Sequence, residues 1–121
     1  MTDEKRRMPE LIKQLKDENQ YTRRDAANWL GKMGADGSFA VPALIETLGD
    51  KNREVRYYVA QALGQIGDPR ALHPLAKRLW DKAAYVRDAA AEGLKQLDTP
   101  EAERMLSEPL RRFLRFILRR N

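Results

Sequence analysis

The stretch "EVRYYVAQALGQIGDPRAL", residues 54–72, decides the fold of this chain. Its apolar residues recur every three or four positions and so form one stripe along an α-helix: Val55, Val59, Ala60, Leu63 and Ile66. Gly67 then suits a left-handed helix stop. Asp68 followed by Pro69 predicts the capped start of another helix. The stretch therefore predicts a buried helix, a tight stop and a new helix.

The same arrangement occurs three times along the chain, in blocks at residues 9–34, 42–67 and 74–98. When the blocks are aligned on an aspartate that follows the first predicted helix, the residues downstream stay in register. The matching positions are Asp17, Asp50 and Asp81, then Arg23, Arg56 and Arg87, then Ala27, Ala60 and Ala91, then Leu30, Leu63 and Leu94. Each block predicts one pair of helices. Since one pair cannot bury its apolar face alone, we expect the three pairs to stack.

Composition supports one helical domain and excludes several classes of site. The 121 residues are 42% hydrophobic and 34% charged, and they can enclose a single core. The chain has no cysteine, which excludes disulfides, thiolate metal sites and cysteine nucleophiles. The N-terminal residues lack the apolar segment of a signal peptide, and no apolar run reaches the length of a membrane span. We therefore expect a cytoplasmic protein.

The repeated pattern L-x-x-x-L-x-D … V-R-x-x-A-A-x-x-L-G-x-I-G-D-P-R-A is matched best at residues 50–72. This pattern resembles the short HEAT-like repeats of the phycobilin (PBS) lyase type, and the resemblance covers residues 9 to about 102. It implies an all-α, right-handed α-solenoid in which the second helices line a concave surface. It says little about function, since such repeats occur in bilin lyase subunits, hydroxylases, DNA-repair glycosylases and scaffolds.

The concave surface carries the candidate binding residues. Tyr57 and Tyr58 are adjacent and so point about 100° apart on a helix, which leaves at least one of them outside the core. Together with Trp29 they are predicted to form an aromatic cluster, of the kind enriched at binding hot spots. The candidate partner-binding residues are Arg24, Asn28, Trp29, Lys32, Tyr57, Tyr58, Gln61 and Gln65. An alternative interpretation is that Trp29 covers the open face of the first repeat.

Other positions on the second helices are also predicted to be exposed in this row. They are Asp25 in the first block, Ala62 in the second, and Asp88, Ala89, Glu92, Gly93 and Gln96 in the third. The predicted surface therefore changes from aromatic to acidic along the array.

The sequence offers no credible catalytic or metal site. The recurring arginines at positions 23, 56 and 87 allow either a ladder for an anionic ligand or ion pairs with the recurring aspartates, and repetition favours the structural role. His73 is the only histidine and has no clustered partners, nor the paired His-Glu motifs of HEAT-like hydroxylases. Ser38 and Ser107 occupy predicted helix starts, and Trp80 is predicted to cover the core of the last repeat. We expect no catalytic residues, metal or cofactor.

The C-terminal segment differs from the repeats in charge. The net charge is +5, with 23 basic and 18 acidic residues, and five arginines fall in the last eleven residues. Residues 107–121 predict an amphipathic helix with one apolar and one basic side. The candidate docking residues are Arg111, Arg112, Arg115, Phe116, Arg119 and Arg120. Such a helix could cap the solenoid, bind an anionic membrane or dock on a partner.

These observations predict two parts, a repeat domain at residues 1–106 and the basic helix at 107–121. The predicted function is a non-catalytic protein-protein interaction module: a small adaptor, scaffold or assembly factor that binds another protein through its concave face. One alternative is an accessory subunit of an enzyme system such as a bilin lyase. Another is a peripheral membrane protein anchored by its basic helix. Nucleic acid is disfavoured as a partner because a lone basic helix lacks a groove-reading fold.

Overall fold

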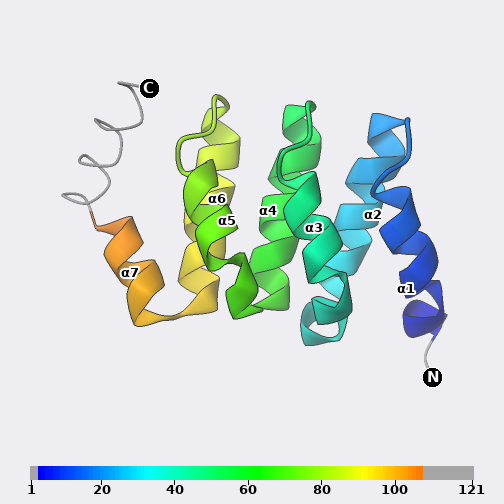
Figure 1. Cartoon of the computed structure of the whole chain (residues 1–121), viewed down its shortest axis with the longest axis horizontal. Helices are drawn as coiled ribbons and strands as arrows, with labels where there is room; N and C mark the ends of the chain where they lie inside the picture. Colours follow the sequence, from blue (N-terminus) through cyan, green and yellow to red (C-terminus); the bar gives the residue numbers. More distant parts are fainter. Residues whose placement is uncertain (1–2, 108–121) are drawn as a thin grey trace.

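A computed structural model describes residues 3–107, with side chains from Arg7 onward. Within that range the chain forms seven α-helices and two short 3₁₀ helices (Figure 1). They are α1 (Asp3–Gln14), α2 (Gln20–Lys32), η1 (Gly34–Ala40), α3 (Val41–Thr47), α4 (Arg53–Ile66), η2 (Pro69–Ala71), α5 (Leu72–Arg78), α6 (Ala84–Leu97) and α7 (Pro100–Leu106). The predicted basic helix lies outside the described residues.

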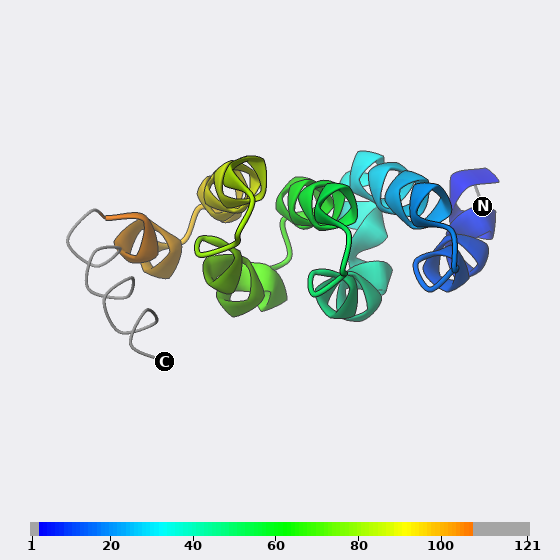
Figure 2. The ribbon, with the colours of Figure 1, turned by 90° about the horizontal axis from the view of Figure 1, so that it is seen from above.

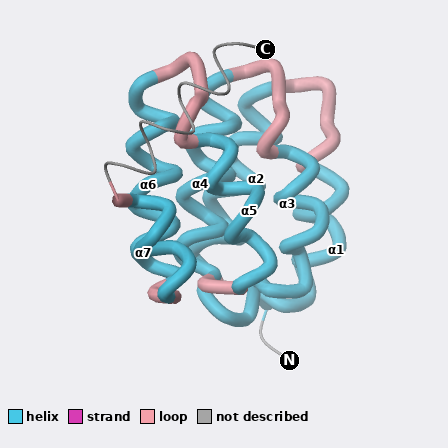
Figure 3. Tube along the Cα trace, turned by 60° about the vertical axis from the view of Figure 1, so that its left-hand side comes forward, coloured by secondary structure: helices cyan, strands magenta, loops and turns pink. Residues whose placement is uncertain are grey.

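The helices stack as consecutive pairs in two layers. Helices α2, α4 and α6 form one layer, and α1, α3, α5 and α7 form the other (Figure 2). The turns between them gather at the two ends of the helices (Figure 3). This one-dimensional stacking of α1–α2, α3–α4 and α5–α6 confirms the predicted α-solenoid. The layer of α2, α4 and α6 is the one predicted to be concave, and its outward surface is called the inner face below.

Local sequence signals set most helix ends as predicted. The Asn19 side chain accepts a hydrogen bond from Tyr21 N–H, and Asn52 accepts from the N–H groups of Glu54 and Val55. Ala83, the residue before α6, provides no side-chain cap. Gly67 ends α4 in the left-handed conformation, at φ 77°. Asn19 and Asn52 thus cap the second helices of repeats one and two, and Gly67 provides the predicted left-handed stop.

Two boundaries differ from the prediction. Helix α1 starts at Asp3 and continues through Pro9, where the repeat pattern places its beginning. The pattern misses this start because residues 3–7 are charged, whereas Met8 is apolar and buried in the core. Residues 34–40, at the junction of the first two blocks, form the 3₁₀ helix η1 where no helix was predicted.

Small residues bring the second helices of successive repeats close together. A Cβ added to Gly31 would lie 2.8 Å from Cα of Ala62, and one added to Gly64 would lie 2.7 Å from Cα of Gly93. The prediction that Ala62, Ala89 and Gly93 are exposed was therefore wrong. They are buried because neighbouring helices pack against them.

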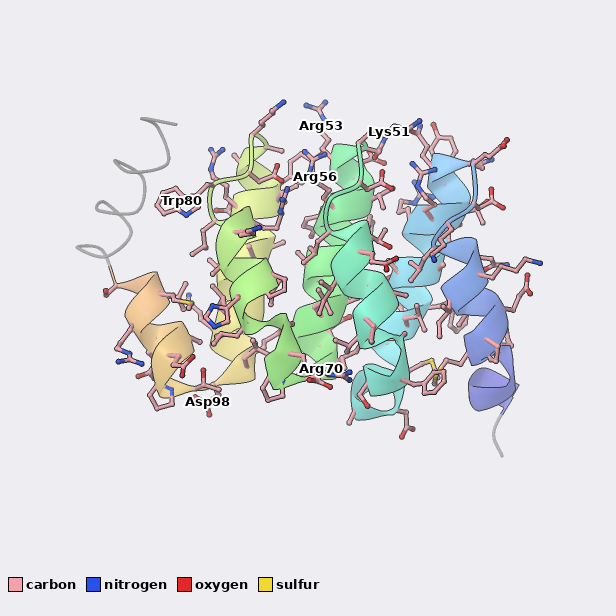
Figure 4. The ribbon with its side chains drawn as sticks, viewed as in Figure 1. Lys51, Arg53, Arg56, Arg70, Trp80 and Asp98 are labelled. Atoms are coloured by element: carbon pink, nitrogen blue, oxygen red, sulfur yellow. The ribbon has the colours of Figure 1, made fainter. Side chains whose placement is uncertain are left out.

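The recurring arginines and aspartates join successive repeats. Arg23 forms a two-pronged ion pair with Asp50, Nε to Oδ2 at 2.7 Å and Nη2 to Oδ1 at 3.0 Å. Arg56 pairs in the same way with Asp81, at 2.8 and 3.0 Å, and in Figure 4 it lies toward the turn between α5 and α6. The third guanidinium nitrogen binds the preceding turn, for example Arg56 Nη1 to the Asp50 carbonyl at 2.8 Å. These pairs confirm the structural interpretation of the repeated arginines.

The Asp81 carboxylate stays charged in this setting. Burial alone would raise its pKa, but the hydrogen bond from Arg56, the backbone N–H of Ala83 and the contact with Arg78 hold the pKa below its usual value. Its side chain is 2% exposed and that of Arg56 is 12% exposed, so the pair is largely removed from water. The pair thus joins α4 to the turn between α5 and α6 of the next repeat.

Candidate functional site

The inner face is hollowed by a groove of about 440 Å³ between α4 and α6. The lining residues are Tyr57, Gln61 and Gln65 from α4, and Tyr85, Asp88, Ala89, Glu92, Gly93 and Gln96 from α6. Ala89 and Gly93 are small because α4 packs against α6 at these positions, and this leaves room above them. Three of the predicted binding residues, Tyr57, Gln61 and Gln65, therefore line one groove.

Three tyrosines form an aromatic cluster beside this groove. The rings of Tyr57 and Tyr58 lie 5.1 Å apart, centroid to centroid, at an interplanar angle of 82°. The rings of Tyr57 and Tyr85 lie 5.5 Å apart at 71°. Both pairs have the edge-to-face geometry that aromatic rings prefer. The cluster explains why α4 carries two adjacent tyrosines: Tyr57 turns toward α6, and both rings pack partly on the core.

Tyr85 was missed by the sequence analysis, which took the binding row from register-equivalent positions. Two neighbouring second helices contact each other through different sides. A residue on one of them therefore contacts a residue on the next that lies about one turn before its register equivalent. Tyr57 matches Asp88 in register but contacts Tyr85, and Arg24 matches Tyr57 but reaches Glu54. The sequence did contain a signal for Tyr85, because it is an aromatic residue one helical turn before Asp88.

Trp29 does not belong to this cluster. Within the described residues its ring contacts cations instead: Arg7 Cζ lies 5.0 Å and Lys32 Nζ 5.7 Å from the ring centroid. Its register equivalents are Ala62 and Gly93, which are packed against the second helix of the preceding repeat. Among the described residues no second helix packs against α2 on the side of Trp29, so a large side chain fits there. This placement agrees with the alternative interpretation, in which Trp29, 42% exposed, covers the open face of the first repeat.

Arg24 closes the inner face between α2 and α4. Its guanidinium lies 3.1 Å from the Asp25 carboxylate, 3.7 Å from that of Glu54 and 5.1 Å from the ring centroid of Tyr21. The hydrogen bond to Asp25 raises the pKa of Arg24, and the negative charges of Asp25 and Glu54 act in the same direction against partial burial. Arg24 is thus paired within the chain. Asn28 is half-buried on the same helix, and Lys32 is exposed beside Trp29.

The carboxylates of Asp88 and Glu92 have no ion-pair or hydrogen-bond partner among the side chains described, from Arg7 to Ser107. They lie four residues apart on α6, so they share one face of that helix. Both are exposed to solvent. Within the part of the chain that the structure describes, no lysine or arginine lines the groove, which is therefore acidic as well as aromatic.

Chemistry-bearing residues elsewhere are dispersed. Within residues 3–107 no group of three or more His, Asp or Glu could hold a metal ion. Ser107 follows the end of α7, where its Oγ donates to the Arg104 carbonyl at 2.8 Å, and Ser38 lies within η1. Trp80 is half-buried against the core, as predicted. None of the helices in the described range has the length and apolar character needed to cross a membrane.

The predicted docking residues of the basic helix lie beyond Ser107, outside the described residues. Their three interpretations therefore stay predictions.

Phe39, which the sequence analysis did not consider, is 73% exposed on η1. A single exposed apolar residue is common on protein surfaces and marks no site alone.

Comparison with known proteins agrees with this architecture. No curated protein matches the chain. The family model for HEAT repeats matches residues 8–110, a span that begins in α1 and covers every helix pair described above. The match is to HEAT repeats in general, so the finer resemblance to the PBS lyase type stays a prediction. Stacked helix pairs and a family match over most of the chain lead to one conclusion: this protein belongs to the HEAT-repeat family.

Proposed function

We propose that this protein is a non-catalytic adaptor that binds a partner protein through its inner face, with the α4–α6 groove at the centre of the contact. HEAT repeats generally mediate protein-protein interaction and are typically non-catalytic, which supports a protein partner. The observation that carries the proposal is the tyrosine cluster of Tyr57, Tyr58 and Tyr85 beside an open groove.

The chemistry of this surface suits a partner contact. Tyrosines supply large apolar area at low conformational cost and can still donate a hydrogen bond, and they are frequent at binding hot spots. The amide side chains of Gln61 and Gln65 have no hydrogen-bond partner among the described residues, so they are free to bind a partner's polar groups. The sequence candidates Asn28 and Lys32 would lie at the edge of such a contact.

The test is affinity capture with a purified chain as bait, followed by reconstitution with the purified protein it captures. The groove variant is Tyr57→Ala with Tyr85→Ala. A second variant, Gln61→Arg, fills the groove without removing a ring. The matched control is His73→Ala with Lys77→Ala, two exposed residues of α5 in the opposite layer.

A partner that both groove variants lose and the control retains would support the proposal. Each bait must first unfold at a temperature close to that of the unchanged chain. Retention of every specific partner by both groove variants would refute the inner-face site. The bilin lyase alternative and the membrane alternative gain no support from the described residues and are not proposed further.

A further inference from the structure

The exposed aromatic rings of the first repeat already hold cations from this chain. Arg24 lies 5.1 Å from the ring centroid of Tyr21, three residues earlier on α2. Arg7 and Lys32 flank the ring of Trp29 at 5.0 and 5.7 Å. These contacts have the distances of cation–π interactions. In the first repeat, cations of the chain itself therefore occupy the faces of these two rings.

The third repeat has a tyrosine at the same register position as Tyr21, but no cation three residues later. Tyr85 is the register equivalent of Tyr21, and it is 37% exposed. The residue three positions later, which is Arg24 in the first repeat, is here Asp88. Glu92 follows one turn further along α6. The ring thus stands beside two carboxylates. Among the described side chains these carboxylates have no ion-pair partner, and no basic side chain lines the groove.

We propose, on the basis of the function proposed above, that the partner segment is a basic peptide and that the α4–α6 groove takes one of its arginine side chains. A guanidinium can stack on the Tyr85 ring while its N–H groups donate to Asp88 or Glu92, because it is both planar and a multiple donor. Arg24 makes this same combination within the chain, with Tyr21 on one side and carboxylates on the other.

The surroundings favour a peptide over other cations. The amides of Gln61, Gln65 and Gln96 line the groove beside the acids, and they can bind the backbone of an extended segment. The five C-terminal arginines account for the whole net charge of +5, so the remaining 18 basic and 18 acidic residues balance. A basic segment would therefore meet residues 1–110, which carry no net charge, and an acidic groove on their surface. The acidic groove would repel an anionic membrane or nucleic acid.

The test uses the full chain and a short fluorescein-labelled peptide in which arginines alternate with glycine and serine. Its comparison peptide carries citrulline, which has nearly the same shape but no charge, at each arginine. Fluorescence anisotropy gives the two dissociation constants. We expect the arginine peptide to bind at least about tenfold more tightly, and to weaken as salt is raised. Equal binding of the two peptides would overturn the proposal.

Variants locate the site. Asp88→Asn with Glu92→Gln should raise the Kd of the arginine peptide roughly tenfold. The matched control, Glu10→Gln with Glu18→Gln, removes the same charge from exposed positions of the first repeat and should change the Kd less than about twofold. Tyr85→Leu should weaken binding roughly fivefold while Tyr85→Phe retains it, because phenylalanine keeps the ring face. An equal loss in the control variant would overturn the proposal.

Amide chemical shifts give a readout that needs no variant. Addition of the arginine peptide to the labelled chain should move the signals of α4 and α6 most, and shifts confined to other helices would contradict the site. The outcome also separates the two proposals. If the captured partner is lost by the tyrosine variant and kept by Asp88→Asn with Glu92→Gln, the adaptor function stands and the arginine site falls.

Discussion

The three register-equivalent aspartates provide an internal test of the arginine–aspartate ion pairs between successive repeats. Asp17, Asp50 and Asp81 each accept the backbone N–H of the residue two positions later, at 2.8 or 2.9 Å. Only Asp50 and Asp81 also accept an arginine of the preceding repeat. Replacement by alanine removes the same turn contact at all three positions, so the differences between the variants isolate the contribution of the ion pairs.

The magnitude follows from burial and geometry. The turn hydrogen bond contributes about 1 kcal/mol, which is the expected cost of Asp17→Ala. Removal of one partner from a buried ion pair costs about 3–5 kcal/mol. Arg56 is 12% exposed and keeps its bond to the Asp50 carbonyl, so the lower figure applies. We expect Asp81→Ala to cost about 4 kcal/mol in total, and Asp50→Ala a similar amount.

Urea unfolding followed by far-ultraviolet circular dichroism measures these losses, and thermal unfolding should give a difference of about 10 °C between Asp81→Ala and Asp17→Ala. The slope of the free energy of unfolding against urea must stay constant among the variants for the comparison to hold. If all three variants lose the same stability, the arginine contacts contribute nothing and the aspartates serve only their turns.

The same pair predicts a response to acid. The folded pKa of Asp81 is lowered, so its contribution is fully present above its unfolded pKa of about 3.9 and is lost as pH falls through the folded value. The stability gap between the unchanged chain and Asp81→Asn should therefore be constant near neutral pH and shrink in the range below about pH 4. A gap that does not change down to the acid limit would contradict this assignment.

Three further substitutions test the helix ends and the helix contacts by urea unfolding. Ala83→Asn should stabilise by about 1 kcal/mol, because Ala83, the residue before α6, lies at φ −92° and ψ 127° and provides no side-chain cap. Asp98→Gly should stabilise by about 1 kcal/mol, since Asp98 is left-handed at φ 52°. Gly64→Ala should destabilise by about 1–3 kcal/mol despite better helix propensity, because the new Cβ would meet the backbone of Gly93 at 2.7 Å. Its control, Gly49→Ala, meets only a carbonyl oxygen at 3.8 Å and should be near neutral.

The repeat pattern was sufficient to predict the helix pairs, their caps and the solenoid, because these depend on residues that recur in register. It also predicted the structural role of the arginines from their repetition. It failed where a contact joins different positions of successive repeats. Ala62 is buried because Gly31 of α2 packs against it. Gly31 is not the register equivalent of Ala62, so alignment of the repeats could not predict this contact.

The candidate site shows the same division. Tyr57, Gln61 and Gln65 were predicted and line the groove, whereas Tyr85 was missed and Trp29 was placed in the wrong cluster. A helical wheel gives the side of a helix on which a residue lies, but not which residue of the next helix it meets. That depends on how far α6 is shifted along α4, which the small residues at the contact decide.

The positions proposed to bind a partner are those where the backbone repeats and the side chain does not. Arg24, Tyr57 and Asp88 occupy one register position on α2, α4 and α6. The first closes its interface with an ion pair to Glu54, and the second makes a ring contact with Tyr85. The third remains unpaired within the described residues. A position that serves only the stack would be expected to hold the same residue in each repeat, as Arg23 and Arg56 do. At this register position the helix is kept in each repeat but the side chain differs. This difference supports the proposal that a partner binds at the α4–α6 groove.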